Sequence, residues 1–230
     1  MAGAALGAVG VLAVDRANPS ALSGADKARV EQVVRDYVLT HPEIIPEAMQ
    51  RLQDRESAKA VAAAGVDIAT PFGGAWSGNP RGDVTLVEYF DYNCGYCRAV
   101  LPQLKQLTDR DSKLRIVYRE LPVLAESSRA AARISLLAAA QGKFGAFHDA
   151  LYAAGPVSDA TIAAAAETAG VDLTKAAAFA PRADAEIARN LKAAGQLGIS
   201  GTPSWVVGDR VLAGALPIEQ IEAALKAARR

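Results

Sequence analysis

Apolar residues follow the spacing of strands in two short stretches near the middle of the chain. Residues 84–90 are β-branched, aromatic or apolar with a single acid, and they contain neither a helix cap nor a breaker, which predicts a buried strand. Residues 114–121 form a second such stretch, and Pro122 ends it. A helical pattern separates the two stretches, so we expect them to pair in parallel through a right-handed crossover.

Helical patterns dominate the stretch that follows, and no convincing strand interrupts them. Helices are predicted at 127–152, 159–169, 173–179 and 183–197, where glycine and proline separate the apolar stripes. These helices predict an inserted helical domain at about 124–198.

The strand pattern returns near the end of the chain. Residues 204–207 and 210–213 flank Gly208-Asp209, a dipeptide suited to a tight turn, which predicts an antiparallel hairpin. Pro217 then begins an amphipathic helix with a basic last turn. With the two earlier strands, these elements predict an α/β domain.

A helical stripe precedes all of these strands. From residue 25 the apolar side chains recur at i, i+3, i+4 and i+7, and after an interruption at Pro42 a second segment restores the stripe. The apolar positions are Val30, Val33, Val34, Tyr37, Val38, Ile45, Ala48, Met49 and Leu52. Because this N-terminal helical segment, 23–70, has no strand partners of its own, its apolar face must pack either on the same chain or on another chain.

The first residues of the chain are apolar as well. Residues 2–14 have about the length of the hydrophobic region of a signal peptide and are too short to span a bilayer comfortably. We therefore interpret 1–22 as a signal-like or disordered apolar segment and expect export, although no Lys or Arg precedes the run. A disordered tail and an uncleaved anchor are the alternatives.

Residues 70–83 are rich in turn formers and have no periodicity. Phe72 and Trp76 within them predict that this loop packs onto the domain that follows, which we expect to comprise 71–230. The loop that joins the N-terminal helices to that domain should therefore be packed against the domain.

Composition describes a globular chain that is long enough to bury a core. The sequence is 51% hydrophobic and 22% charged with a net charge of +0, and this balance gives no indication of nucleic-acid binding. Aromatic residues make up only 6% while alanine is abundant, which favours helices over a sheet-dominated fold.

The two cysteines of the chain, Cys94 and Cys97, stand at C-x-x-C spacing where the first strand gives way to a helix. The free N–H groups and the positive dipole end of that helix favour a thiolate on Cys94, which makes Cys94 the candidate nucleophile. Cys97 lies beside it on the more buried side, close enough to form a disulfide and resolve a mixed one. A zinc half-site or two structural thiols are the alternatives, but zinc prefers four ligands and only His41 and His148 remain. We expect neither metal nor cofactor.

These residues resemble the thioredoxin superfamily through the strand, the C-x-x-C pair, Pro102 in the following helix and the late Gly201-Thr202-Pro203. Within it, residues 88–97 and the helical insertion resemble periplasmic DsbA-type thiol oxidoreductases. Residues 34–48 resemble the ScsC-like branch, which carries a helical oligomerisation segment. The resemblance covers about residues 25 to 228 and implies a thioredoxin-like fold.

The resemblance implies roles for further residues. The Thr202-Pro203 bond should be cis and lie against the cysteine pair, and the main chain of Thr202 should pair with an extended substrate. Glu88 matches a buried acid whose raised pKa would let it exchange a proton with Cys97, whereas Asp91 is expected on the surface. Gly95 and Tyr96 would contact substrate, and because they bring no charge we expect a mild oxidant.

The expected function is thiol–disulfide exchange on exported proteins in the periplasm, with disulfide isomerisation favoured. By resemblance the chain forms a homo-oligomer, most simply a trimer, and a membrane redox partner resets its cysteines. A monomeric dithiol oxidase, a copper-binding envelope protein that uses the same thiols and a structural protein are the alternatives. The aromatic stretch 143–148, His148 included, is expected to be core.

Overall fold

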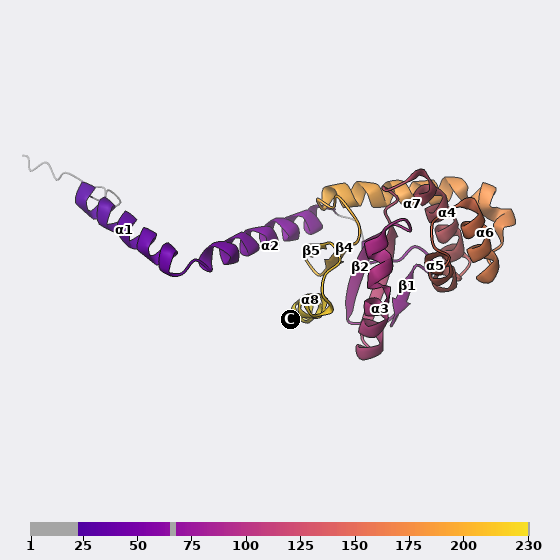
Figure 1. Cartoon of the computed structure of the whole chain (residues 1–230), viewed down its shortest axis with the longest axis horizontal. Helices are drawn as coiled ribbons and strands as arrows, with labels where there is room; N and C mark the ends of the chain where they lie inside the picture. The colour runs from indigo at the N-terminus through magenta and orange to yellow at the C-terminus, as the bar shows by residue number, and fades with distance from the viewer. Residues whose placement is uncertain (1–22, 65–67, 230) are drawn as a thin grey trace, which may run out of the picture. The chain divides into compact units, whose positions relative to one another are not determined.

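The computed structural model describes residues 23–64 and 68–229, drawn in colour in Figure 1. The apolar segment 1–22 lies outside the described residues. The chain divides into two compact units, one that ends at Gln50 and one that begins at Arg51. None of the described helices is long and apolar enough to cross a membrane.

The N-terminal stripe forms two helices, as predicted. α1 (Gly24–Thr40) begins at Ser23, whose hydroxyl accepts the N–H of Asp26, and ends at His41 immediately before Pro42. α2 (Ile44–Ala64) follows. No residue of α1 is buried, and the stripe residues of both helices up to Leu52 remain largely exposed.

A five-stranded mixed sheet forms the centre of the second unit, in the order β1-β3-β2-β4-β5. β2 (Val84–Phe90) and β3 (Leu114–Glu120) are parallel, and β4 (Ser204–Val207) and β5 (Arg210–Ala213) form the expected antiparallel hairpin. β4 joins β2 in antiparallel fashion. The sequence did not predict β1 (Trp76–Gly78), which pairs antiparallel with β3 from within the turn-rich loop.

The helical insertion differs from its prediction at two places. The expected single helix 127–152 is divided into α4 (Glu126–Ala140) and α5 (Phe144–Ala153) at Gly142, which has a φ of +70°. The insertion continues with α6 (Asp159–Thr168), the 3₁₀ turn η1 (Leu173–Lys175) and α7 (Ala176–Gln196). Pro181 does not end a helix as expected, because it lies near the start of α7 and removes only one intrahelical hydrogen bond.

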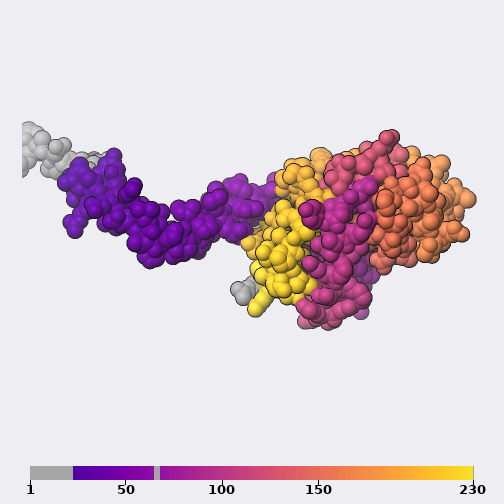
Figure 2. Space-filling model, in the orientation of Figure 1, coloured from indigo at the N-terminus to yellow at the C-terminus, as the bar shows by residue number. Residues whose placement is uncertain are grey.

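Both faces of the sheet are covered. Apolar side chains of α3 (Gly95–Arg110), α8 (Ile218–Ala228), α5 and α6 pack with one face, whereas the ends of α7 and α2 pack with the other. In Figure 1 the yellow α8 and β5 lie on one side of the magenta α3, and α5 and α6 of the insertion lie on the other. Figure 2 shows the same order on the surface. This arrangement is the expected thioredoxin-like fold with a helical insertion.

Candidate active site

The first cysteine lies where β2 gives way to α3. Cys94 is the N-cap of α3, and its backbone is extended with φ −80° and ψ 111°. Its Sγ accepts the N–H of Cys97 at 3.3 Å, one of the amides that the first turn of a helix leaves without an internal partner. The sulfur of Cys94 therefore lies at the positive end of the helix dipole.

Both cysteines are free thiols with little exposure. Cys97 is fully buried, as expected, and Cys94 is 4% exposed, which is less than expected for an accessible thiol. The two residues between them are exposed, Tyr96 by 70%. The turn between the two cysteines therefore lies at the surface, while the sulfurs lie below it.

The Thr202-Pro203 loop lies against this pair. The peptide bond between the two residues is cis, as expected, and the Cys94 thiol donates to the Thr202 carbonyl oxygen at 3.3 Å. This loop accounts for the low exposure of Cys94. A cavity of about 200 Å³ adjoins the loop and is lined by residues 198–204 together with Val211, Ala213 and Gly214.

Glu88 is buried in the sheet on the same side as the cysteines. It alternates with Leu86 and Phe90, which pack in the cluster that contains Cys94 and Cys97, and only 1% of its surface is exposed. Burial, followed by the charge of Cys94, raises the pKa of Glu88 to about 8. The expectation of a buried acid with a raised pKa is confirmed.

The second cysteine is held in the thiol form. Burial raises the pKa of Cys97 far above its ordinary value, and the neighbouring charge of Glu88 raises it further. Thiol–disulfide exchange needs a thiolate, so Cys97 would have to lose this proton before it could react.

Comparison with known families agrees with this geometry. Residues 85–226 match the DSBA-like thioredoxin domain. The chain belongs to this family. Residues 26–59 match a second family, the N-terminal domain of the copper resistance protein ScsC.

Solved structures extend the comparison. A thioredoxin-like oxidoreductase from Silicibacter pomeroyi is 38% identical, with a TM-score of 0.64 over 72% of this chain and 95% of that one. ScsC from Proteus mirabilis is 30% identical, with a TM-score of 0.64 over 91% and 97% of the two chains. A periplasmic thioredoxin-like protein from Salmonella enterica is 30% identical, with a TM-score of 0.61 over 74% and 95%.

Curated relatives match over a shorter part of their length. The Na⁺/H⁺ antiporter NhaA 1 of Salinispora arenicola is 32% identical over 150 residues, which is 63% of this chain. The chain spans 23% of the length of that antiporter. The likeness therefore concerns one segment of the antiporter.

Asp91 in this DSBA-like domain is buried, and its expected place on the surface is wrong. Its carboxylate accepts the N–H groups of Asn93, Val123 and Leu124 at 2.8 to 3.0 Å and the hydroxyl of Ser128 at 2.7 Å. Asp91 thereby ties the loop before Cys94 to the loop before α4. The bond from the Asn93 N–H to Asp91 is a local turn of a kind that Asp favours. The other partners, Val123, Leu124 and Ser128, are distant in sequence.

His148 is core, as expected. Its ring packs among Phe90, Tyr92, Tyr118 and Phe144, its Nδ1 lies 3.1 Å from the Tyr92 hydroxyl, and burial lowers the pKa of His148 to about 3. The aromatic stretch therefore forms part of the support beneath the cysteines.

Sequence reasoning also missed Glu120, at the end of β3, whose pKa burial raises well above its ordinary value. The part of the chain that the structure describes contains no group of three or more His, Cys, Asp or Glu side chains that could hold a metal ion.

Proposed function

We propose that this chain catalyses thiol–disulfide exchange on exported proteins through Cys94 and Cys97. The observation that supports this most strongly is the position of the Cys94 sulfur, which lies 3.3 Å from the Cys97 N–H and 3.3 Å from the Thr202 carbonyl oxygen. A helix N-terminus stabilises a thiolate at this sulfur. The cis loop offers main-chain groups to a bound substrate beside it.

The reaction proceeds in two exchanges. The Cys94 thiolate attacks one sulfur of a substrate disulfide, which forms a mixed disulfide and releases the other substrate sulfur as a thiolate. Cys97 then attacks the Cys94 sulfur, so that the substrate leaves as a dithiol and Cys94 and Cys97 become a disulfide. The reverse sequence oxidises a substrate dithiol. For isomerisation, a thiol of the substrate itself attacks the mixed disulfide.

Glu88 takes the proton of Cys97 during the second exchange and returns it in the reverse direction. With its pKa raised to about 8, the carboxyl is mostly protonated near neutral pH and can return a proton, while a minor carboxylate fraction can accept one. Thr202 holds the main chain of the substrate, and the exposed Gly95-Tyr96 turn contacts its side chains. These roles follow the family resemblance and the geometry described above.

Association of chains through the N-terminal helices favours isomerisation over simple oxidation. The apolar stripe of α1 and early α2 stays exposed, with Val33 at 61% and Met49 at 67%, and residues 26–59 match the ScsC N-terminal domain. Exposed stripes of this kind are covered in coiled-coil-like assemblies with cyclic symmetry. We infer a homotrimer whose active sites face a shared substrate.

The periplasm is the compartment that suits this chemistry, since disulfides form and persist there. A structurally similar protein of Salmonella enterica is described as periplasmic. A membrane redox partner would return the cysteines to their working state after each turnover.

Recovery of activity from scrambled ribonuclease, compared with insulin reduction, tests the isomerase proposal. The full-length protein is expected to do both, while the Cys94→Ser variant does neither. Insulin reduction without ribonuclease recovery would identify a dithiol oxidoreductase that is not an isomerase. Tight binding of Cu(I) by protein that is inactive in both assays would support the copper-binding alternative.

A further inference from the structure

Four buried side chains form a square on the sheet face that packs with the cysteines. Glu88 and Phe90 project from β2 to this face. Their register partners on β3 are Tyr118 and Glu120, respectively. The ring centroid of His148, on α5, is 5.0 Å from the ring of Phe90 and 5.0 Å from the ring of Tyr118. Because those two rings occupy one diagonal of the square, His148 lies between the two glutamates on the other diagonal.

Three polar atoms of this group have no hydrogen-bond partner among the residues that the structure describes. They are Oε2 of Glu88, Oε1 of Glu120 and Nε2 of His148. All three side chains are at most 4% exposed, so bulk water does not satisfy them. Nearly all buried polar groups in folded proteins are paired. Atoms that are left over at one place in the core are therefore candidates to pair with one another.

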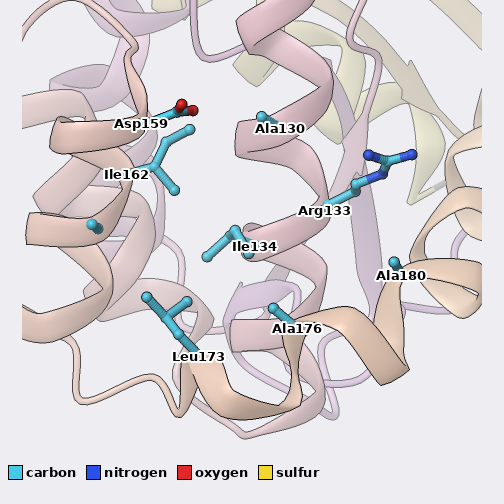
Figure 3. Close-up of a pocket in the computed structure, with 9 residues that line it drawn as sticks. Ala130, Arg133, Ile134, Asp159, Ile162, Leu173, Ala176 and Ala180 are labelled. Carbon is cyan, nitrogen blue, oxygen red and sulfur yellow. The ribbon is translucent and has the colours of Figure 1, made fainter.

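The other ring nitrogen of His148 begins a chain of hydrogen bonds. Nδ1 lies 3.1 Å from the Tyr92 hydroxyl, which lies 2.9 Å from the hydroxyl of Ser135 on α4. Burial raises the pKa of Glu120, and the Ser135 hydroxyl, which hydrogen-bonds that carboxyl, lowers it in part. Ser135 is fully buried, whereas its neighbour Ile134 lines a surface groove of about 350 Å³ between α4 and α6 (Figure 3). The chain therefore runs through the core and away from that groove.

The bonds of this chain can run in one consistent direction. When the Ser135 hydroxyl donates to Glu120, Tyr92 donates to Ser135, since each hydroxyl has one proton to give. Nδ1 of His148 then donates to Tyr92. Burial lowers the pKa of His148 to about 3, so the ring is neutral and its Nε2 carries no proton. A bare Nε2 is an acceptor, and because Glu120 already has the Ser135 hydroxyl, Glu88 is the remaining donor.

We propose that Nε2 of His148 accepts a hydrogen bond from the protonated carboxyl of Glu88 and so positions this carboxyl for proton exchange with Cys97. The proposal rests on the proposed function. When a substrate thiolate attacks Cys94 in the disulfide, Cys97 leaves as a thiolate, takes the proton of Glu88 and becomes a thiol. Glu88 is then a carboxylate. In the reverse exchange Glu88 regains the proton from Cys97, and its new O–H group bonds Nε2 again. His148 gains and loses no proton, so it is a positioning residue.

Other titratable groups face this pair from each neighbouring element. They are Tyr118 and Glu120 of β3, Asp149 and Tyr152 of α5, Asp91 and Tyr92 of the β2–α3 connection, Cys94, and Cys97 of α3. Burial raises the pKa of each of the three tyrosines, so they stay neutral where Glu88 titrates. After burial, the charge of Cys94 raises the pKa of Glu88. Each titration below therefore uses the fully reduced protein, in which Cys94 is in the same state throughout the series.

Nitrogen-15 NMR of the imidazole rings tests this pair in the full-length reduced protein. The chain has two histidines, and a His41→Gln variant assigns their signals. His148 should carry its proton on Nδ1 and none on Nε2. The Nε2 signal should shift when Glu88 loses its proton, with a midpoint at about pH 8. Glu88→Gln should abolish that step, because its amide does not titrate.

Stopped-flow mixing of the reduced protein with excess oxidised glutathione tests the role in the reaction. Attack by Cys94 depends on the glutathione concentration, whereas the attack by Cys97 that closes the disulfide does not. His148→Phe keeps a ring in the aromatic cluster and removes the acceptor, so the O–H group that forms on Glu88 has no partner. The Cys97 step, measured on its plateau above the titration of Glu88, should slow about tenfold. The Cys94 step should be unchanged.

Two variants serve as controls. Tyr118→Phe removes another hydroxyl from the same aromatic cluster, one that pairs with Ser77, and should leave both kinetic steps and the Nε2 signal unchanged. His148→Gln supplies a neutral acceptor, an amide oxygen, and should recover part of the lost Cys97 rate. A purely structural role for His148 would slow both steps together and would not respond to the return of an acceptor.

Each contrary result has a distinct meaning. A proton on Nε2 below pH 8, or an Nε2 signal that does not follow Glu88, would overturn the inference. A step that survives Glu88→Gln and is lost in Glu120→Gln would identify Glu120 as the partner, and the inference would again be wrong. An unchanged Cys97 rate in His148→Phe would remove the positioning role. Failure of Cys94 to form a mixed disulfide with glutathione would overturn the proposed function, whatever the NMR spectrum of His148 shows.

Discussion

Replacing Glu88 with glutamine should change the pH dependence of stability in a calculable way. The folded protein holds the proton of this buried carboxyl up to about pH 8, whereas an unfolded chain releases it near the ordinary pKa of 4.5. Between these values the folded state binds more protons than the unfolded state, so the free energy of unfolding falls as pH rises. The glutamine variant keeps the shape of the side chain and lacks this loss.

The magnitude follows from the two pKa values. Each pKa unit corresponds to about 1.4 kcal/mol, so from pH 5 to pH 8 the wild type should lose about 3–4 kcal/mol of stability relative to Glu88→Gln. Burial is the principal cause of the raised pKa of Glu88, and the charge of Cys94 is the second. Most of the effect should therefore remain when Cys94 is replaced by alanine.

Urea unfolding of the reduced protein, followed by tryptophan fluorescence, measures this difference. Trp205 is fully buried on β4 and is the register partner of Glu88, which makes it a local reporter. Glu167→Gln removes a carboxyl from an exposed position of α6 and serves as the control. Parallel stability profiles for wild type and Glu88→Gln, within about 1 kcal/mol from pH 5 to pH 8, would refute the assignment of a proton to buried Glu88.

Three further predictions concern the thiols, the loop and the assembly. Limited alkylation at neutral pH should label Cys94 ahead of Cys97, because burial raises the pKa of Cys97; equal labelling in peptide mass spectrometry would contradict this. Asp91→Asn should destabilise the protein by about 2–4 kcal/mol through its charge-assisted hydrogen bonds, and urea unfolding at unchanged stability would count against that role. Removing residues 1–50 should give a monomer by light scattering that reduces insulin and no longer isomerises ribonuclease, whereas a persisting oligomer would place the interface elsewhere.

Local patterns were sufficient where one segment determines its own structure. The seven-residue strands β2 and β3 follow from their apolar runs, and the β4–β5 hairpin follows from Gly208-Asp209. Cys94 at the start of α3 follows from the change of pattern after Phe90. In each case the residues that decide the structure are neighbours in sequence.

The sequence was insufficient where a distant partner decides the structure. β1 has only three residues and exists because β3 offers it a free edge. Asp91 looked like a surface acid because its partners come from distant segments: Val123 and Leu124 from the β3–α4 connection and Ser128 from the first turn of α4. Pro181 suggested a helix boundary, but α7 begins before it, at Ala176, and continues beyond it. There Ala183 and Ile187 pack with Ala132 and Leu136 of α4, which are distant in sequence.

Covalent trapping tests the central claim most directly. The full-length Cys97→Ser protein is incubated with scrambled ribonuclease, and the products are separated without reductant and mapped by mass spectrometry. The account predicts a mixed disulfide between ribonuclease and Cys94, which the Cys94→Ser variant does not form. Absence of the adduct in Cys97→Ser, or an equal adduct through Cys97 in the Cys94→Ser protein, would contradict the assignment of Cys94 as the nucleophile.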